Sequence, residues 1–410
     1  MDYNLYSLPN GIRLLYKPFA STVTHACIVI NSGSRDEPEG KDGLAHFIEH
    51  LLFKRTKRRN TTQILNRLEA VGGDLNAYTT KEYTCIHGSF LNPHLERALD
   101  LFQDLVFHSV FPQDEMVKEK SVILDEIASY EDQPEEAIND DFEDLLFKGH
   151  PLGRNILGTE DTVTAFTKED ILNFLKSNYR TEEILIGVTG NYDLKRLQKI
   201  FTKIFGAVPP NVTKKNRFSV NGYSPTANNL SKAISQTHCV IGNRAFSIHH
   251  EYKTALLLLN NILGGTGMSS RLNLQIREKY GIAYTIESNY TPLTDTGIFS
   301  IYFGTDKEKT NKALKLVSNE LKKLRDIKLG AVQLHQAKQK FIGQIALGEE
   351  NRMGLIISMC KSLLDYDRVD TLEEIFQKIN SVTAEQLIEI ANEILNPQQL
   401  SCLIFEPSDQ

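Results

Sequence analysis

"TKEDILNFLKSNYRTEEILIGVTG", residues 167–190, has a counterpart 216 residues later in "TAEQLIEIANEILNPQQLSCLIFEP", residues 383–407. Each stretch begins with a Thr that can cap a helix, continues with apolar residues at helical spacing, and ends in an apolar strand. Ala77-Tyr78-Thr79 likewise recurs as Ala283-Tyr284-Thr285, at an offset of 206 residues. Two collinear repeats at nearly the same offset predict a duplicated domain.

Strand-like and helix-like segments alternate around these repeats. Residues 4–17 read as two strands around a Pro-Asn-Gly turn, and residues 113–130 read as a long helix. Frequent hairpin-type connections favour antiparallel pairing. We therefore expect an α+β protein of two similar sequential domains, each a mostly antiparallel sheet with helices on one face. The expected domains are residues 1–212 and 229–410, joined by a polar linker at 213–228.

Length and composition limit the classes of function. A chain of 410 residues is long enough for about two domains. Its net charge of −6 argues against nucleic acid as the main partner. Five scattered cysteines without a CxxC pair indicate reduced thiols. The first residues, "MDYNLYSLPNG", lack the pattern of a signal peptide, and the longest apolar runs are too short to cross a bilayer. We expect a cytoplasmic protein with no membrane partner.

The stretch "GLAHFIEHLLFK", residues 43–54, places His46, Glu49 and His50 within an apolar helical pattern. Residues four apart share a face of a helix, so both imidazoles can point at one Zn2+ ion. Glu49 flanks that face and can accept a proton from a zinc-activated water. The spacing is HxxEH, the inverse of HExxH. The alternative is two core histidines and a surface glutamate.

A catalytic zinc site needs a third protein ligand, and the helix expected at 113–130 offers Glu119 and Glu126. We expect Glu126 to point toward the interior and to bind the metal, because it lies among the apolar residues Val122, Ile123, Leu124 and Ile127. Glu119 could then accept a hydrogen bond from a ligand histidine. In the alternative, both are solvated helix glutamates.

These residues resemble the pitrilysin or insulinase family of zinc metallopeptidases. The resemblance starts from HFIEH and Glu126, which lies 76 positions after His50. It extends to "GGDLNAYTTKEYT" (72–84), "HPLGRNILG" (150–158) and "SSRLNLQIREKYGIAYTIES" (269–288), and so covers essentially the whole chain. The chain is most similar to the short, two-domain members, such as mitochondrial processing peptidase subunits and bacterial zinc proteases. Of these two groups, we expect the protein to belong with the bacterial one.

The resemblance implies a zinc-dependent endopeptidase with one Zn2+ per chain. His46, His50 and Glu126 would hold the metal, Glu49 would activate the water, and Glu119 would support a ligand histidine. At the 206-residue offset the second domain has Tyr252, Ala255 and Leu256 in place of the motif, so only the first domain could bind metal.

On the substrate side, the resemblance implies that Asn76 and Ala77 lie on an edge strand that pairs with the peptide backbone. Arg277 would hold a substrate carbonyl, and Tyr284 would contact substrate and hydrogen-bond the developing oxyanion.

In this family four such domains form a clamshell chamber, so the resemblance implies that this two-domain chain forms a homodimer acting on peptides or unfolded polypeptides. Two alternatives stay open. One is a catalytically silent subunit that binds peptides or supports an assembly. The other is the catalytic half of a heterodimeric processing peptidase.

Overall fold

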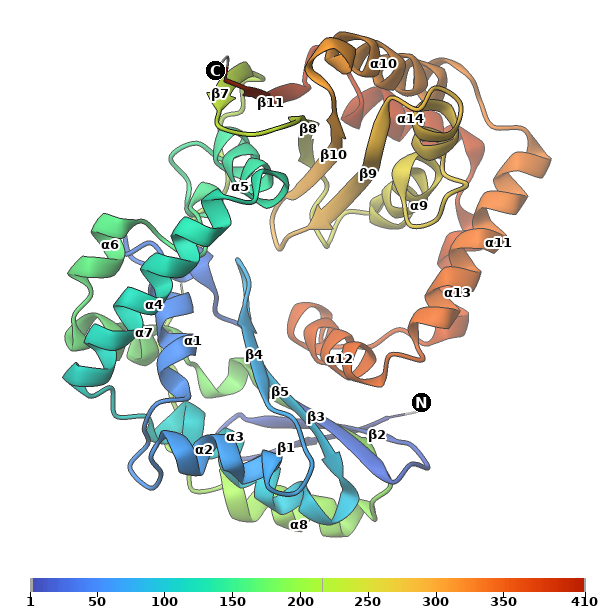
Figure 1. Cartoon of the computed structure of the whole chain (residues 1–410). Coiled ribbons are helices and arrows are strands. Elements are labelled where there is room, and N and C mark those ends of the chain that lie inside the picture. The colour runs from blue at the N-terminus through green and yellow to red at the C-terminus, as the bar shows by residue number, and fades with distance from the viewer. Residues whose placement is uncertain (1–2, 216, 409–410) are drawn as a thin grey trace. The chain divides into compact units, whose positions relative to one another are not determined.

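The computed structural model describes residues 3–215 and 217–408, which fall into two compact units (Figure 1). Residues 1, 2, 216, 409 and 410, which belong to the expected domains and linker, lie outside the described residues. The first unit is formed by Met1–Ala128, Arg154–Phe218 and Gly348–Thr371. The second is formed by Ser129–Gly153, Ser219–Leu347 and Leu372–Gln410.

The first unit is built on a six-stranded sheet with the order β1-β2-β6-β3-β5-β4. Pairing is antiparallel except between β2 and β6, which run parallel. β4 ends the sheet, so one of its edges has no strand beside it. The strands are β1 (Asn4–Ser7), β2 (Arg13–Pro18), β3 (Val23–Ile30), β4 (Asn76–Thr79), β5 (Thr84–Leu91) and β6 (Ile184–Gly190).

The second unit has a five-stranded sheet with the order β7-β11-β8-β10-β9. Its parallel pair, β7 and β11, matches β2 and β6, and the remaining strands follow in the same order as β3, β5 and β4. The α+β class and the duplicated topology predicted from the sequence are thus confirmed. The strands are β7 (Ala227–Lys232), β8 (Thr237–Ala245), β9 (Ala283–Pro292), β10 (Gly297–Thr305) and β11 (Ser401–Pro407).

One face of each sheet carries the expected layer of helices, and apolar side chains of sheet and helices form the main core of each unit. In the first unit these helices are α1 (Leu44–Leu52), α2 (Thr61–Glu69), α3 (Leu95–His108), α4 (Gln113–Glu131), α6 (Glu160–Ala165), α7 (Lys168–Asn178) and α8 (Leu194–Phe205). In the second unit they are α9 (Lys253–Gly264), α10 (Thr310–Asp326), α11 (Ala331–Gly348), α13 (Leu372–Ser381) and α14 (Ala384–Ile394).

The opposite face of each sheet is covered by one further helix, whereas the sequence predicted helices on one face only. α12 (Arg352–Tyr366) packs on the first sheet, and α5 (Pro134–Leu146) packs on the second (Figure 1). The physical reason is that both faces of the central strands are apolar, as at Leu14 and Leu15, and both need cover. Each covering helix comes from the other half of the chain, so segments of the two units alternate along the sequence. The boundaries 1–212 and 229–410 stay a prediction.

Across residues 3–215 and 217–408, every helix is too short or too polar to span a lipid bilayer.

Candidate active site

The helix that carries HxxEH begins after a glycine and is capped by the side chain of a residue six positions before that glycine. Gly43 has φ of 92°, and a Cβ there would lie 2.5 Å from the Leu157 carbonyl oxygen, so only glycine fits. The buried Glu37 carboxylate accepts hydrogen bonds from the backbone N–H groups of Gly43 (3.1 Å) and Ala45 (2.8 Å). A carboxyl group that accepts hydrogen bonds from the first N–H groups of α1 fixes where the helix starts.

α1 and α4 bring His46, His50 and Glu126 together. The two Nε2 atoms lie 3.2 Å apart, and the Glu126 carboxylate oxygens lie 3.8 Å from Nε2 of His46 and 3.5 Å from Nε2 of His50. Among the residues that the structure describes, this is the one group of three possible ligands whose donor atoms all lie within 4.8 Å of one another. Two imidazole nitrogens and a carboxylate oxygen are a donor set found at catalytic zinc sites, so these residues fit zinc.

Glu119 holds the outer nitrogen of His50. Nδ1 of His50 lies 2.9 Å from one oxygen of Glu119, whose other oxygen lies 2.6 Å from Nζ of Lys54. A proton on Nδ1 leaves the Nε2 lone pair facing Glu126 and a metal.

The two histidines have opposite pKa shifts. Burial lowers the pKa of His46 to about 3, helped by the charge of His50. Burial also lowers the pKa of His50, but the hydrogen bond to Glu119 and the charge of Glu126 outweigh it, so this pKa is raised. His46 is therefore neutral, as a metal ligand must be, across the physiological range.

One expectation for α4 is wrong in its detail. α4 buries Met116, Glu119 and Ile123, so the interior carboxylate is that of Glu119, with a side chain 5% exposed. The Glu126 side chain lies two turns beyond Glu119 on α4 and is 42% exposed. The apolar run is only partly buried: Ile123 lies in the core, but Val122 beside it is 48% exposed.

Glu49 is 8% exposed, and one of its carboxylate oxygens accepts a hydrogen bond of 2.6 Å from the Thr79 hydroxyl. Burial raises the pKa of Glu49, and the hydrogen bond from Thr79 opposes that shift. In the sequence, Thr79 is part of the repeat Ala77-Tyr78-Thr79 and of the stretch 72–84, and neither pattern assigns it a role. No local pattern linked it to Glu49, because the two residues are 30 positions apart.

Asn76 and Ala77 lie on β4, the edge strand beside α1. Asn76 is exposed, and Ala77 packs partly against the main core of the first unit. An open strand edge can accept a peptide through main-chain hydrogen bonds. That these two residues bind substrate stays a prediction.

Arg277 and Tyr284 belong to the second unit. The Arg277 guanidinium lies 5.5 Å from the centre of the Tyr284 ring, and Tyr284 is 80% exposed on the edge strand β9. The structure brings these two side chains together, and their role toward substrate stays a prediction. In α9, Ala255 and Leu256 are buried apolar residues without metal-binding atoms.

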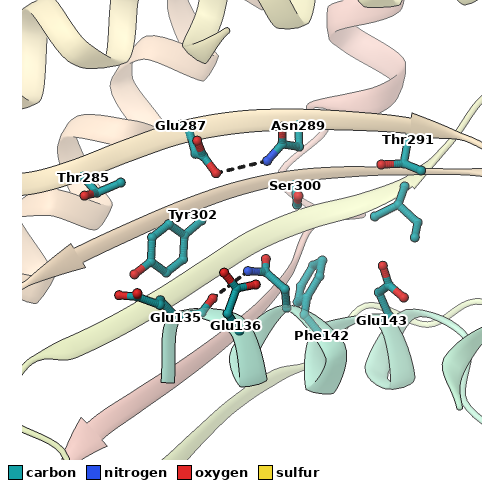
Figure 2. Close-up of a pocket in the computed structure, with 12 residues that line it drawn as sticks. Glu135, Glu136, Phe142, Glu143, Thr285, Glu287, Asn289, Thr291, Ser300 and Tyr302 are labelled. Atoms are coloured by element: carbon teal, nitrogen blue, oxygen red, sulfur yellow. Dashed lines mark hydrogen bonds between the residues drawn. The ribbon is translucent and has the colours of Figure 1, made fainter. Parts of the chain in front are cut away.

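A groove of about 480 Å³ lies in the second unit between α5 and the strands β9 and β10 (Figure 2). Its lining holds four carboxylates and no lysine or arginine; the glutamates are Glu135, Glu136, Glu143 and Glu287. Hydroxyl and amide groups of β9 and β10 face these carboxylates. Within the described residues the groove contains no set of three metal ligands, so it differs in kind from the histidine site.

The chain matches known proteins along most of its length. A family model described as Insulinase (Peptidase family M16) matches residues 13–160, and one described as Peptidase M16 inactive domain matches residues 165–341. A Bacillus subtilis protein named uncharacterized zinc protease YmxG is 30% identical over 403 residues, which cover 97% of each chain. An uncharacterized zinc protease of Mycobacterium leprae is 33% identical over 399 residues, covering 95% of this chain and 88% of that protein.

Solved structures show the same fold. A protease from Helicobacter pylori matches with a TM-score of 0.90 at 22% identity, over 99% of both chains. A Pseudomonas fluorescens structure described as a peptidase M16 inactive domain matches with a TM-score of 0.91 at 20% identity, over 100% of this chain and 98% of its own. The two family models together span most of the chain, and the Bacillus subtilis relative matches it over 97% of its length. This chain therefore belongs to the M16, or insulinase, family of peptidases.

Proposed function

We propose that this protein is a zinc-dependent endopeptidase that hydrolyses peptides or unfolded polypeptides. The observation that carries the proposal is the convergence of His46, His50 and Glu126 beside the buried carboxylate of Glu49. Relatives named zinc proteases along nearly the whole chain support it.

In the proposed mechanism His46, His50 and Glu126 hold one zinc ion per chain. Zinc, when bound, would act as a Lewis acid that lowers the pKa of a water molecule toward neutrality and polarises the scissile carbonyl. Glu49 accepts the proton of the attacking water and passes it to the leaving amine. Burial raises the pKa of Glu49, which makes its carboxylate a stronger base toward the attacking water.

The substrate would pair as a strand with the open edge of β4, near Asn76 and Ala77. Arg277 would hold a substrate carbonyl, and the exposed phenol of Tyr284 would donate a hydrogen bond to the developing oxyanion. Binding through main-chain groups implies loose sequence specificity.

We further propose a homodimer. This chain holds the zinc ligands in its first unit and the Arg277–Tyr284 pair in its second, so two copies would supply the four domains of a closed chamber.

We also propose a cytoplasmic location. All five cysteines are free thiols, which supports it.

The test is hydrolysis of a mixed set of quenched peptides by the purified full chain, with Glu49→Gln as the inactive variant. Glu115→Gln, on the opposite end of α4 from Glu126, is the matched control. We expect equal zinc content in all three proteins and activity lost only in Glu49→Gln. Activity retained in Glu49→Gln would reject the proposal. A zinc-loaded wild-type protein without activity would point to a different partner chain or a peptide-binding role.

A further inference from the structure

Thr79 links the catalytic helix to the edge of the first sheet. It is the last residue of β4 and pairs with Thr84 of β5. Its hydroxyl donates a hydrogen bond of 2.6 Å to Oε2 of Glu49 on α1. A carboxylate in a largely buried position has few ways to orient, and a charge-assisted hydrogen bond of this length selects one of them.

The backbone that follows Thr79 is held firmly in place. The carbonyl of Thr80 accepts a hydrogen bond from the Ser34 N–H (3.0 Å), and a Cβ at Gly33 would lie only 2.2 Å from that oxygen. In the turn after β4, Lys81 donates to the Arg154 carbonyl at 2.6 Å.

Glu82, in the same turn, forms a buried ion pair of 2.7 Å with Arg35. Their side chains are 5% and 1% exposed, so the pair is shielded from water. The strand end that carries the Thr79 hydroxyl is therefore anchored by its pairing with Thr84 and by the contacts of the residues immediately after it.

The hydrogen bond from Thr79 gives the two carboxylate oxygens of Glu49 different roles. With Oε2 held by Thr79, Oε1 is left to receive a proton from water. Because the Thr79 hydroxyl donates its hydrogen bond, it favours the ionised form of Glu49, which is the form that acts as a base.

We propose that Thr79 is a positioning residue that fixes the Glu49 carboxylate for proton transfer and ties its orientation to β4, the strand that would pair with substrate. A peptide that pairs with β4 would restrain the same strand that restrains Glu49. This inference rests on the proposed peptidase function.

The test compares Thr79→Val, which removes the hydroxyl at nearly constant shape, with Thr79→Ser, which keeps it. Thr84→Val is the matched control, because it removes a buried strand hydroxyl that bonds to the Ser32 carbonyl (2.8 Å) and not to Glu49. For Thr79→Val we expect kcat to fall about 10- to 100-fold, as for other residues that orient catalytic groups, with KM and zinc content near the wild-type values. Thr79→Ser should restore most of kcat, and Thr84→Val should leave it unchanged.

Two further measurements separate positioning from a general loss of structure. In the inactive Glu49→Gln background, Thr79→Val should leave the zinc content unchanged, because Thr79 acts on Glu49 and not on the metal ligands. A crystal structure of Thr79→Val should show the Glu49 carboxylate moved from its wild-type position; Thr79→Ala serves if the valine variant does not fold.

Wild-type kcat in Thr79→Val, or an unmoved Glu49 in its structure, would overturn the role of Thr79 while leaving the peptidase proposal intact. Full activity of Glu49→Gln would instead reject the peptidase proposal itself.

Discussion

Nδ1 of His50 lies 2.9 Å from the carboxylate of Glu119, while Nε2 of the same ring faces Glu126 at 3.5 Å. One imidazole therefore bridges a buried carboxylate and a half-exposed one. The buried partner orients the ring, and in the proposed zinc site the more exposed one would bind the metal together with His50.

Glu119→Gln should weaken zinc binding about 10- to 100-fold, since a neutral amide orients His50 but adds less to the basicity of its Nε2 atom. Competition with a zinc-binding dye would measure the affinity. Glu115→Gln, a change of the same kind near the start of α4, should leave the affinity unchanged. Equal affinities in both variants would contradict a supporting role for Glu119.

Glu49→Gln and Arg277→Ala should each be inactive alone and should regain part of the activity when mixed. In a homodimer with two composite sites, one copy supplies an intact zinc site and the other an intact Arg277. Subunit exchange would be followed with differently tagged copies. Exchange without recovered activity would reject the composite site.

Asp36→Asn should destabilise the first unit by about 3–5 kcal/mol, because it leaves two buried cations without their shared partner. Asp36 lies 2.8 Å from Lys215 and 2.9 Å from Arg217, and its side chain is 2% exposed. Urea unfolding at neutral pH would measure the loss, and Asp132→Asn, at an exposed position, is the control.

The same residue predicts a pH dependence. Burial raises the pKa of Asp36, but the hydrogen bond from Arg217 and the charge of Lys215 outweigh it and hold this pKa below its ordinary value. The ionised Asp36 therefore stabilises the folded protein fully at pH values above its unfolded-state pKa of about 4. This stabilisation is lost as the pH falls below that value toward the lower folded-state pKa. Stability of Asp36→Asn should change less over that acid range than stability of the wild type.

Gly187→Ala should destabilise the protein by about 1–3 kcal/mol through overpacking. A Cβ on this β6 residue would lie 2.6 Å from the sulfur of Cys360 on α12 and 2.8 Å from the sulfur of Cys27 on β3. Gly343→Ala on α11, with no atom within 4 Å of the added carbon, should be neutral or stabilising by about 0.5–1 kcal/mol. Equal unfolding midpoints for the two variants would show that α12 does not pack against β6 as described.

The sequence by itself determined the features that depend on local spacing. Two histidines four apart on a helix share a face wherever that helix lies, and the recurrence of a capped helix and an apolar strand marks a duplicated topology. Both patterns could be recognised because the HxxEH motif and each copy of the repeat are short stretches of contiguous sequence.

Only the tertiary structure decided which distant groups meet. It buried Glu119 and left Glu126 half-exposed, placed α5 and α12 on the sheet formed mainly by the other half of the chain, and brought Thr79 to Glu49. Burial and hydrogen bonding depend on packing between segments far apart in the sequence, and no local periodicity records that packing.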